Sequence, residues 1–433
     1  MSALSHAVVE RALASAQPLT LGTVTELVGL HLVVTGLPVA VGDLVEVSTG
    51  STGRLLAEVA ALRPRAAVCL PLGVITGVRV GDRVRHTGGP LRVRVGEQLL
   101  GRVLDGLGRP VDGGPAIDHL PQVGVDLAAP SAYSRPRITT PLPLGVRALD
   151  SLVPCGRGQR IGIMAGSGVG KSSLLSMIAR GGGADVNVIA LVGERGREVR
   201  EFLDNDLGPA GLARSVVVVA TSDAPAVERM RSAFVATRIA EWFRDAGRDV
   251  VLMMDSLTRV AMAQREIGLS AGEPPATRGY PPSVFGLMPR LLERAGTSPA
   301  GSITGLYTVL VEGDDLQDPI GDTARSILDG HVVLSRSLAT SGHFPAVDVL
   351  ESISRLTGAV TTPDQQQDAT RLRRLLAAHR NVKELVEIGA YAAGSDADAD
   401  AALALLPQID GFLRQRMDEP AGDTWTALKE LVA

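Results

Sequence analysis

The chain has 433 residues, 45% hydrophobic and 21% charged, which predicts two or three domains with sizeable buried cores. A net charge of −4 and an aromatic content of 3% argue against a nucleic-acid-binding surface, so no nucleic-acid partner is expected. The sequence shows no membrane-span-length apolar run and no secretory signal, and Cys69 and Cys155 lack metal-ligand spacing. These features predict a cytoplasmic protein that reaches a membrane only through partners.

The N-terminal part begins with two different patterns. Residues 1–17 place Val8, Val9, Ala12 and Leu13 on one face of a short helix, which is either a partner-binding segment or a lead-in. Residues 18–88 contain short alternating runs separated by turns, and they predict a small closed antiparallel β-barrel. Because basic and aromatic residues are scarce there, a structural or subunit-contact role is favoured over oligonucleotide binding.

The remaining residues change from strands with crossover helices to helices alone. Apolar runs at 160–165, 188–192, 215–220, 250–254 and 305–311 alternate with helical patterns, which predicts a parallel sheet within residues 89–362. Residues 363–433 are predicted to be helical, with helices at 369–378, 382–388 and 398–415. The fold class is therefore α/β, with a β-barrel before the sheet and a helical domain after it.

The strongest motif joins an apolar strand to a helix through glycines, from Ile161 to Ser172. It fits the Walker A pattern G-x-x-x-x-G-K-[ST], except that Ala165 replaces the first glycine. Glycines allow backbone N–H groups to surround phosphates, and the helix N-terminus adds partial positive charge. The predicted ATP-binding residues are Gly166, Ser167, Gly168, Val169, Gly170, Lys171, Ser172 and Ser173.

Within this loop, Lys171 is expected to contact the β- and γ-phosphates and the Ser172 hydroxyl to bind Mg²⁺. Lysine is rare here, with only Lys171, Lys383 and Lys429 among 43 basic residues. The persistence of lysine at this position is consistent with a role that arginine cannot take over.

Acidic residues follow two further apolar strands. Asp255 ends the run 250–254 and is predicted to hold Mg²⁺ in a Walker B role. Glu194 ends a second strand and is predicted to polarise the attacking water. Arg195 could bind phosphate or orient Glu194, and an ordinary surface ion-pair cluster is the alternative for both residues.

These motifs resemble the catalytic subunits of rotary ATPases and type III export ATPases. The resemblance is carried by the phosphate loop, by Gly193-Glu194-Arg195-Gly196-Arg197-Glu198 and by Asp255-Ser256-Leu257-Thr258-Arg259. The segments at 274–283, 307–315 and 326–336 are similar to the export branch rather than to the ATP synthase β subunit. Ile388-Gly389-Ala390-Tyr391-Ala392-Ala393-Gly394-Ser395-Asp396 looks like the flagellar member rather than the injectisome member.

The resemblance implies a homohexameric ATPase ring that energises flagellar type III protein export by unloading and unfolding substrates. It assigns adenine stacking to Phe344. It also assigns to Arg355 the role of the arginine finger, which would reach the γ-phosphate bound by a neighbouring subunit. It implies regulatory and stalk proteins, membrane proteins of the export gate, chaperones and export substrates as partners. The loop at 266–283 would face the ring's channel, and the enzyme would lie in the cytoplasm at the inner face of the cell membrane.

Other functions remain open at this point. An injectisome ATPase would have the same chemistry in a different machine. The export-type segments argue against the catalytic subunit of an ATP synthase. The low aromatic content argues against an RNA translocase. A substrate-docking platform with secondary hydrolysis is the alternative from another class.

Overall fold

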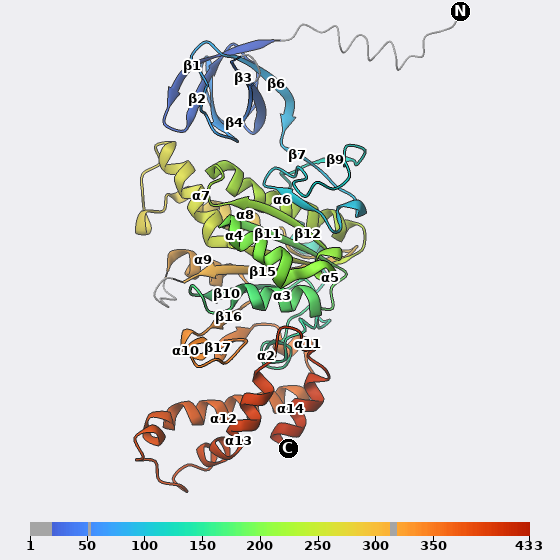
Figure 1. Cartoon of the computed structure of the whole chain (residues 1–433), viewed down its shortest axis with the longest axis vertical. Helices are drawn as coiled ribbons and strands as arrows, with labels where there is room; N and C mark the ends of the chain where they lie inside the picture. The colour runs from blue at the N-terminus through green and yellow to red at the C-terminus, as the bar shows by residue number, and fades with distance from the viewer. Residues whose placement is uncertain (1–19, 51–52, 312–317) are drawn as a thin grey trace, which may run out of the picture. The chain divides into compact units, whose positions relative to one another are not determined.

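The computed structural model describes residues 20–50, 53–311 and 318–433. The helix predicted over residues 1–17 and residues 312–315 of the export-type segment lie outside these ranges. The chain divides into two compact units, residues 1–91 and 92–433 (Figure 1). A further boundary at 362/363 remains a prediction.

The first unit is a closed antiparallel barrel with the strand order β1-β2-β5-β4-β3-β6. Its strands are β1 (Leu21–Val28), β2 (His31–Thr35), β3 (Asp43–Thr49), β4 (Gly53–Arg63), β5 (Ala66–Pro71) and β6 (Arg83–Pro90). Alternate residues such as Val45, Val47, Ala57 and Val59 are buried in its core. The predicted small β-barrel is confirmed.

The second unit is built on a mixed, mainly parallel sheet with the order β17-β16-β10-β15-β13-β11-β12-β8. Strands β10 to β12 cover Arg160–Ala165, Val186–Glu194 and Ser215–Thr221, and β13 to β15 cover Asp249–Asp255, Gly296–Thr297 and Ser302–Leu310. Strands β16 (Gly330–Leu334) and β17 (Val347–Ser354) are antiparallel to each other, whereas β10 is parallel to β15 and β16. Short strands β7 (Arg92–Arg94), β8 (Val103–Asp105) and β9 (Gln122–Gly124) precede this core.

Helices cover both faces of the sheet. Ile161 and Ile163 of β10 share a core with Leu174, Leu175 and Ile178 of α3 (Lys171–Gly181). Because strand side chains alternate between faces, the intervening positions point the other way. There α6 (Ala226–Asp245) packs on β11 and β13, and α7 (Leu257–Ser270) packs on β15.

Shorter helices complete the second unit. They are η1 (Glu97–Leu99), η2 (Ala132–Ser134), α2 (Arg147–Leu152), α4 (Gly196–Glu201), η3 (Phe202–Leu207), α5 (Gly208–Ala213), η4 (Thr277–Gly279), α8 (Pro282–Leu292), α9 (Pro319–Ile327), α10 (Arg336–Thr340) and α11 (Thr357–Val360). The predicted loop at 266–283 is therefore helical at both ends, in α7 and α8.

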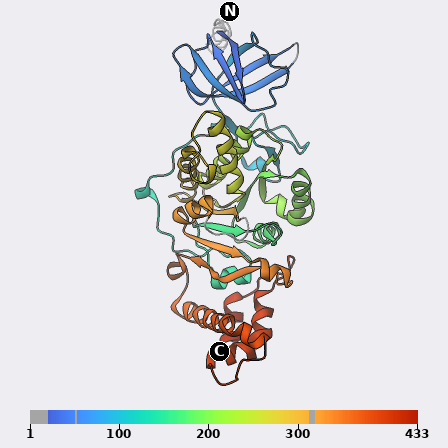
Figure 2. The same ribbon diagram turned by 90° about the vertical axis from the view of Figure 1, so that its left-hand side faces the viewer.

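The C-terminal residues form three packed helices, α12 (Pro363–Glu387), α13 (Ala397–Leu413) and α14 (Thr424–Val432) (Figure 2). The predicted helical character is confirmed, but the separate helices at 369–378 and 382–388 are one continuous helix. Residues 379–381 contain no proline or glycine, and Val382 returns to the buried face. Helix α14 lies within residues 363–433, which were predicted to be helical, although no separate helix was predicted there. No helix within the described ranges is long and apolar enough to cross a bilayer.

Candidate active site

The phosphate loop joins β10 to α3, as its sequence predicts. Gly168 and Gly170 have φ angles of 75° and 88°, in the left-handed region that other residues rarely adopt. This backbone leads directly into α3 at Lys171, so the helix N-terminus points to the loop. The side chain of Val169 is buried in the core, which leaves its backbone as the part that can contact a ligand.

Three charged side chains predicted from separate segments lie together beside this loop. The Nζ atom of Lys171 is 2.5 Å from Oδ1 of Asp255 and 3.3 Å from Oε1 of Glu194. Asp255 ends β13 and is only 3% exposed, while Glu194 ends the neighbouring strand β11. Thr308 of β15 donates a hydrogen bond of 2.8 Å from Oγ1 to the same Asp255 oxygen. Parallel strands therefore bring both acids to one edge of the sheet.

The pKa values follow from this grouping. Burial raises the pKa of Glu194, and the negative charge of Asp255 acts in the same direction, against the ammonium group of Lys171. Burial alone would lower the pKa of Lys171, but the two carboxylates outweigh burial and raise it. The lysine is therefore a stable cation, and Glu194 has a higher proton affinity than an ordinary glutamate.

A cavity of about 740 Å³ opens over these groups and is large enough for a nucleotide. Gly166, Ser167, Gly168, Gly170, Ser172 and Ser173 line it together with the three charged residues. The hydroxyl of Ser172 and the carboxylate of Asp255 are hard oxygen donors, which fit Mg²⁺. The ammonium group of Lys171 beside Asp255 shows that this carboxylate already accepts a cation.

Arg195 lies at the rim of the cavity rather than against Glu194. Its side chain is 77% exposed, and Nη1 is 2.9 Å from Oε1 of Glu198. Glu198 in turn interacts with the side chain of Glu194. The contact of Arg195 with Glu198 therefore resembles the surface ion pair that was the alternative interpretation of the sequence. The side chain of Arg195 is linked to that of Glu194 through Glu198.

Two further arginines line the cavity without having been predicted as site residues. Nη1 of Arg336 donates to the carbonyl of Ser167 at 3.3 Å, and Arg259 lies in the first turn of α7 after Asp255. Both follow a strand end at the same edge of the sheet. A position directly after a predicted strand is the sequence signal that could have identified them as site residues, because the carboxyl ends of parallel strands lie at the same edge of the sheet.

Phe344 lies close to the phosphate loop, in an adjoining hollow of about 500 Å³. A methyl group on Gly170 would come within 3.3 Å of the Phe344 ring, and this ring is 45% exposed in a hollow also lined by Met177 and Met417. Residues from Arg414 to Met417, after α13, complete the wall, which the sequence did not predict. The hollow suits a flat aromatic group such as a nucleobase.

Arg355 is the one predicted site residue that the structure keeps apart from the others. It follows β17, whose last residue Ser354 pairs with Gly330 at the start of β16. It is therefore at the amino edge of the parallel strands, whereas the phosphate loop is at their carboxyl edge. The six residues of β10 separate the two edges by about 20 Å. Arg355 is exposed, and its Nη2 donates to the carbonyl of Arg325 at 3.1 Å.

Comparisons with known proteins agree with this arrangement. The ATP synthase alpha/beta family nucleotide-binding domain matches residues 145–354, and the T3SS EscN ATPase C-terminal domain matches residues 361–430. The "Flagellum-specific ATP synthase" of Bacillus subtilis (strain 168) is 51% identical over 402 residues, covering 92% of each chain. The "Type 3 secretion system ATPase" of Xanthomonas euvesicatoria is 52% identical over 400 residues, covering 92% of this chain and 90% of the relative.

A solved structure extends the similarity to the whole fold. The assembled ATPase EscN of enteropathogenic E. coli, in complex with its central stalk EscO, matches with a TM-score of 0.88 and 44% identity. The match covers 95% of this chain and 100% of that one. This chain therefore belongs to the family of flagellum-specific and type III secretion ATPases, and it is an ATPase.

Proposed function

We propose that this chain hydrolyses Mg·ATP in the cavity over the phosphate loop to energise flagellar type III protein export. The observation that carries the catalytic part is the position of Lys171 between the carboxylates of Asp255 and Glu194. Phosphoryl transfer depends mainly on positioning and on neutralising charge, and these groups supply both.

Each residue has a distinct task in this proposal. Lys171 binds the β- and γ-phosphates, and backbone N–H groups from Gly166 to Ser173 surround them. Ser172 and Asp255 would hold the Mg²⁺ ion, which would neutralise charge on the phosphate oxygens when bound. Glu194, with its raised pKa, orients the attacking water and accepts its proton. Arg195 keeps Glu198 in place beside Glu194.

The position of Arg355 supports a shared site between subunits. A group about 20 Å from its own phosphate loop cannot contact its own γ-phosphate, but it can reach a neighbour's in a closed ring. A homohexamer with Arg355 as the arginine finger accounts for an exposed arginine at this edge of the sheet. Phe344, beside Gly170, then stacks on the adenine of the same chain.

The partners proposed for the ring follow the family. The EscN structure contains a central stalk, and the segment between α7 and α8 is our candidate for the stalk contact. Regulatory proteins, export-gate membrane proteins, chaperones and export substrates complete the proposed set. Through them the ring would work in the cytoplasm, peripheral to the inner face of the cell membrane.

The injectisome is the second candidate, since the Xanthomonas relative is as similar as the Bacillus one. The C-terminal segment at 388–396 favours the flagellar machine. Expression in flagellar and injectisome deletion strains, with motility and effector secretion measured separately, distinguishes the two. Rescue of secretion alone would contradict the flagellar assignment.

The ring mechanism is tested by the ATPase rate per chain against protein concentration, with light scattering in parallel. The expected result is a rate that rises as a hexamer forms. A fully active monomer would overturn the shared site while leaving the ATPase assignment intact. A Glu194→Gln variant that hydrolyses nothing yet supports full export would favour a docking platform over an energising role.

A further inference from the structure

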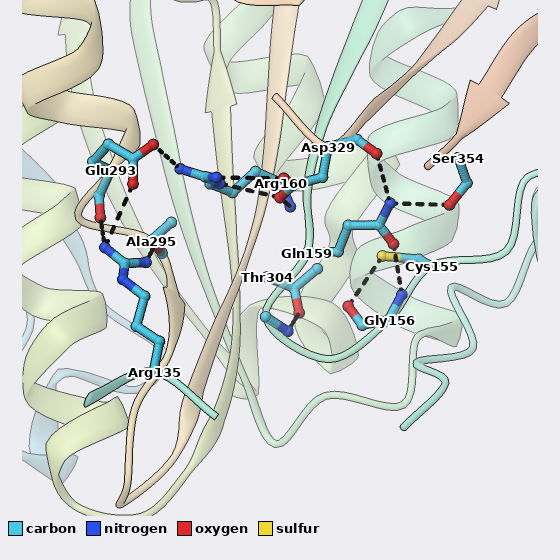
Figure 3. Close-up of polar contacts among 11 residues, drawn as sticks. Arg135, Cys155, Gly156, Gln159, Arg160, Glu293, Ala295, Thr304, Asp329 and Ser354 are labelled. Atoms are coloured by element: carbon cyan, nitrogen blue, oxygen red, sulfur yellow. Dashed lines mark hydrogen bonds and ion pairs between the residues drawn. The ribbon is translucent and has the colours of Figure 1, made fainter. Parts of the chain in front are cut away.

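A polar network occupies the amino edge of the sheet, at the opposite end of β10 from the phosphate loop. It joins Gln159, directly before β10, and Arg160, at the start of β10, to Asp329 before β16 and Ser354 at the end of β17 (Figure 3). None of these residues lines the nucleotide cavity. The ATPase site of the same chain therefore does not account for the network.

Gln159 is the centre of the network and is fully buried. Its Nε2 donates to Oγ of Ser354 at 2.9 Å and to the carbonyl of Asp329 at 3.1 Å. Its Oε1 accepts from the backbone N–H of Gly156 at 2.8 Å. Both amide hydrogens and the amide oxygen are thus satisfied, and the side chain has a single defined orientation.

Asp329 connects this amide to the backbone of Arg355. Its carbonyl accepts from the backbone N–H of Arg355 at 3.0 Å in addition to the bond from Gln159. Its carboxylate accepts from the backbone N and Nε of Arg160, both at 3.1 Å. Gln159 therefore holds the residue before Arg355 directly and holds Arg355 itself through Asp329.

Arg160 extends the network to helix α8. Its Nη1 lies 2.5 Å from Oε1 of Glu293, which follows α8, and Arg135 also approaches Glu293 (Figure 3). Nη1 of Arg135 donates to the carbonyl of Ala295 at 2.7 Å. The contacts of Arg160 and Arg135 with the residues after α8 therefore stabilise the start of β10 on the side away from β17.

The guanidinium group of Arg355 contrasts with this fixed backbone. It is exposed and donates a hydrogen bond to the backbone carbonyl of Arg325. A fixed backbone with an exposed guanidinium group suits a side chain that acts outside its own chain, because anchoring removes the backbone share of the ordering entropy.

We propose that Gln159 and Ser354 are positioning residues that aim Arg355 at the γ-phosphate bound by the neighbouring subunit. The inference rests on the proposed role of Arg355 as an arginine finger. Strand β10 begins directly after Gln159 and ends at the phosphate loop. The same strand therefore connects the site of a chain's own nucleotide with the residue that positions its arginine finger.

The test begins with Ser354→Ala, which removes one hydroxyl from a buried position, and Ser354→Thr, which keeps it. We expect Ser354→Ala to lower kcat by about tenfold with KM and nucleotide affinity unchanged, since a misplaced group costs transition-state contacts only. Ser354→Thr is expected to retain most of the rate. Gln159→Met, of similar volume, gives an independent second variant with the same signature.

Mixed rings show whether Ser354→Ala impairs the nucleotide site of its own chain or the finger that it supplies to its neighbour. A Lys171→Ala chain has no working phosphate loop but donates an intact finger, so mixing it with Ser354→Ala should restore about half of the wild-type rate per Ser354→Ala chain. An Arg355→Ala chain donates no finger, so its mixture with Ser354→Ala should stay slow. The inference would be overturned if Arg355→Ala rescued Ser354→Ala and Lys171→Ala did not, or if neither partner rescued it. Wild-type kinetics for both Ser354→Ala and Gln159→Met would also overturn it.

The mixture of Lys171→Ala with Arg355→Ala separates this inference from the function on which it rests. Activity in that mixture supports the finger acting between subunits, whatever the Ser354 variants do. A dead mixture, with rings verified by light scattering, would overturn the shared site and with it the positioning role.

Discussion

Lys171 and Asp255 form a buried contact of 2.5 Å between the phosphate loop and the end of β13. Glu194 adds a second carboxylate 3.3 Å from the same ammonium group. One cation thus faces two acids, so the site favours a further positive charge at Asp255. In the proposed mechanism this excess of negative charge would attract the divalent ion that accompanies ATP, while the ammonium group of Lys171 would bind the phosphates.

Lys171→Ala is expected to lower ATP turnover by about 10²-fold or more and to weaken nucleotide binding, because the phosphates lose a preorganised cation. The rate and the affinity for a fluorescent nucleotide measure the two effects. Lys383→Ala is the matched control, since Lys383 is exposed on α12 and forms a long, exposed contact of 3.9 Å with Glu387 of the same helix. Equal kinetics for both variants would contradict the phosphate-loop assignment.

Glu194→Gln is expected to retain nucleotide binding and lose most turnover, since the amide cannot accept the proton of the attacking water. Burial raises the pKa of Glu194, so in the wild type the rate should fall on acidification at a higher pH than for an ordinary glutamate. The sign follows from the active form being the carboxylate, which is lost as the pH falls through the raised pKa. Glu198→Gln, at the same cavity, should keep this fall of the rate at acidic pH. If the fall disappeared in Glu198→Gln, Glu198 rather than Glu194 would be the general base.

Phe344→Ala is expected to weaken ATP binding by about 1–3 kcal/mol, the usual value of one aromatic platform for a base. Phe344→Tyr keeps the ring and should bind almost normally. Equilibrium binding of ATP and of inorganic triphosphate separates the effects, because only the nucleotide has a base to lose. A Phe344→Ala variant that weakens both ligands equally would argue against base stacking.

Arg355→Ala is expected to cut turnover by about 10³-fold while folding and nucleotide binding are retained. Its guanidinium is exposed and does not belong to the core, so thermal unfolding should not change. Arg195→Ala, at the cavity rim, should have a much smaller effect. If the two variants are impaired equally, the assignment of the finger is wrong.

Glu241 and Arg294 test the core independently of catalysis. The two side chains are each 1% exposed and form a bidentate pair with both distances at 2.7 Å. Glu241→Ala leaves the arginine buried without its carboxylate and should cost about 3–5 kcal/mol of unfolding free energy. Asp398→Ala, which breaks the exposed pair with Arg374, should cost less than about 1 kcal/mol. Denaturant unfolding of both variants makes the comparison.

The sequence predicted most of the local structure around the site, because each motif is a continuous segment with its own strand or helix signal. Gly168, Gly170 and Lys171 illustrate this, since loop and helix start are encoded side by side. Arg336 and the wall at 414–417 were missed because their relation to the loop depends on strand order and on how α13 packs. Residues 369–388 were divided into two helices because the polar stretch between the apolar positions resembled a connection.

Strand β17 lies between Phe344, three residues before its start, and Arg355, directly after its end. In the proposed ring it therefore serves two nucleotides, one held by its own chain and one by the next. A chain with a damaged β17 would impair its neighbour's turnover as well as its own. In a cell that makes intact and damaged copies together, such an allele would behave as dominant, with the loss of export exceeding its share of the chains.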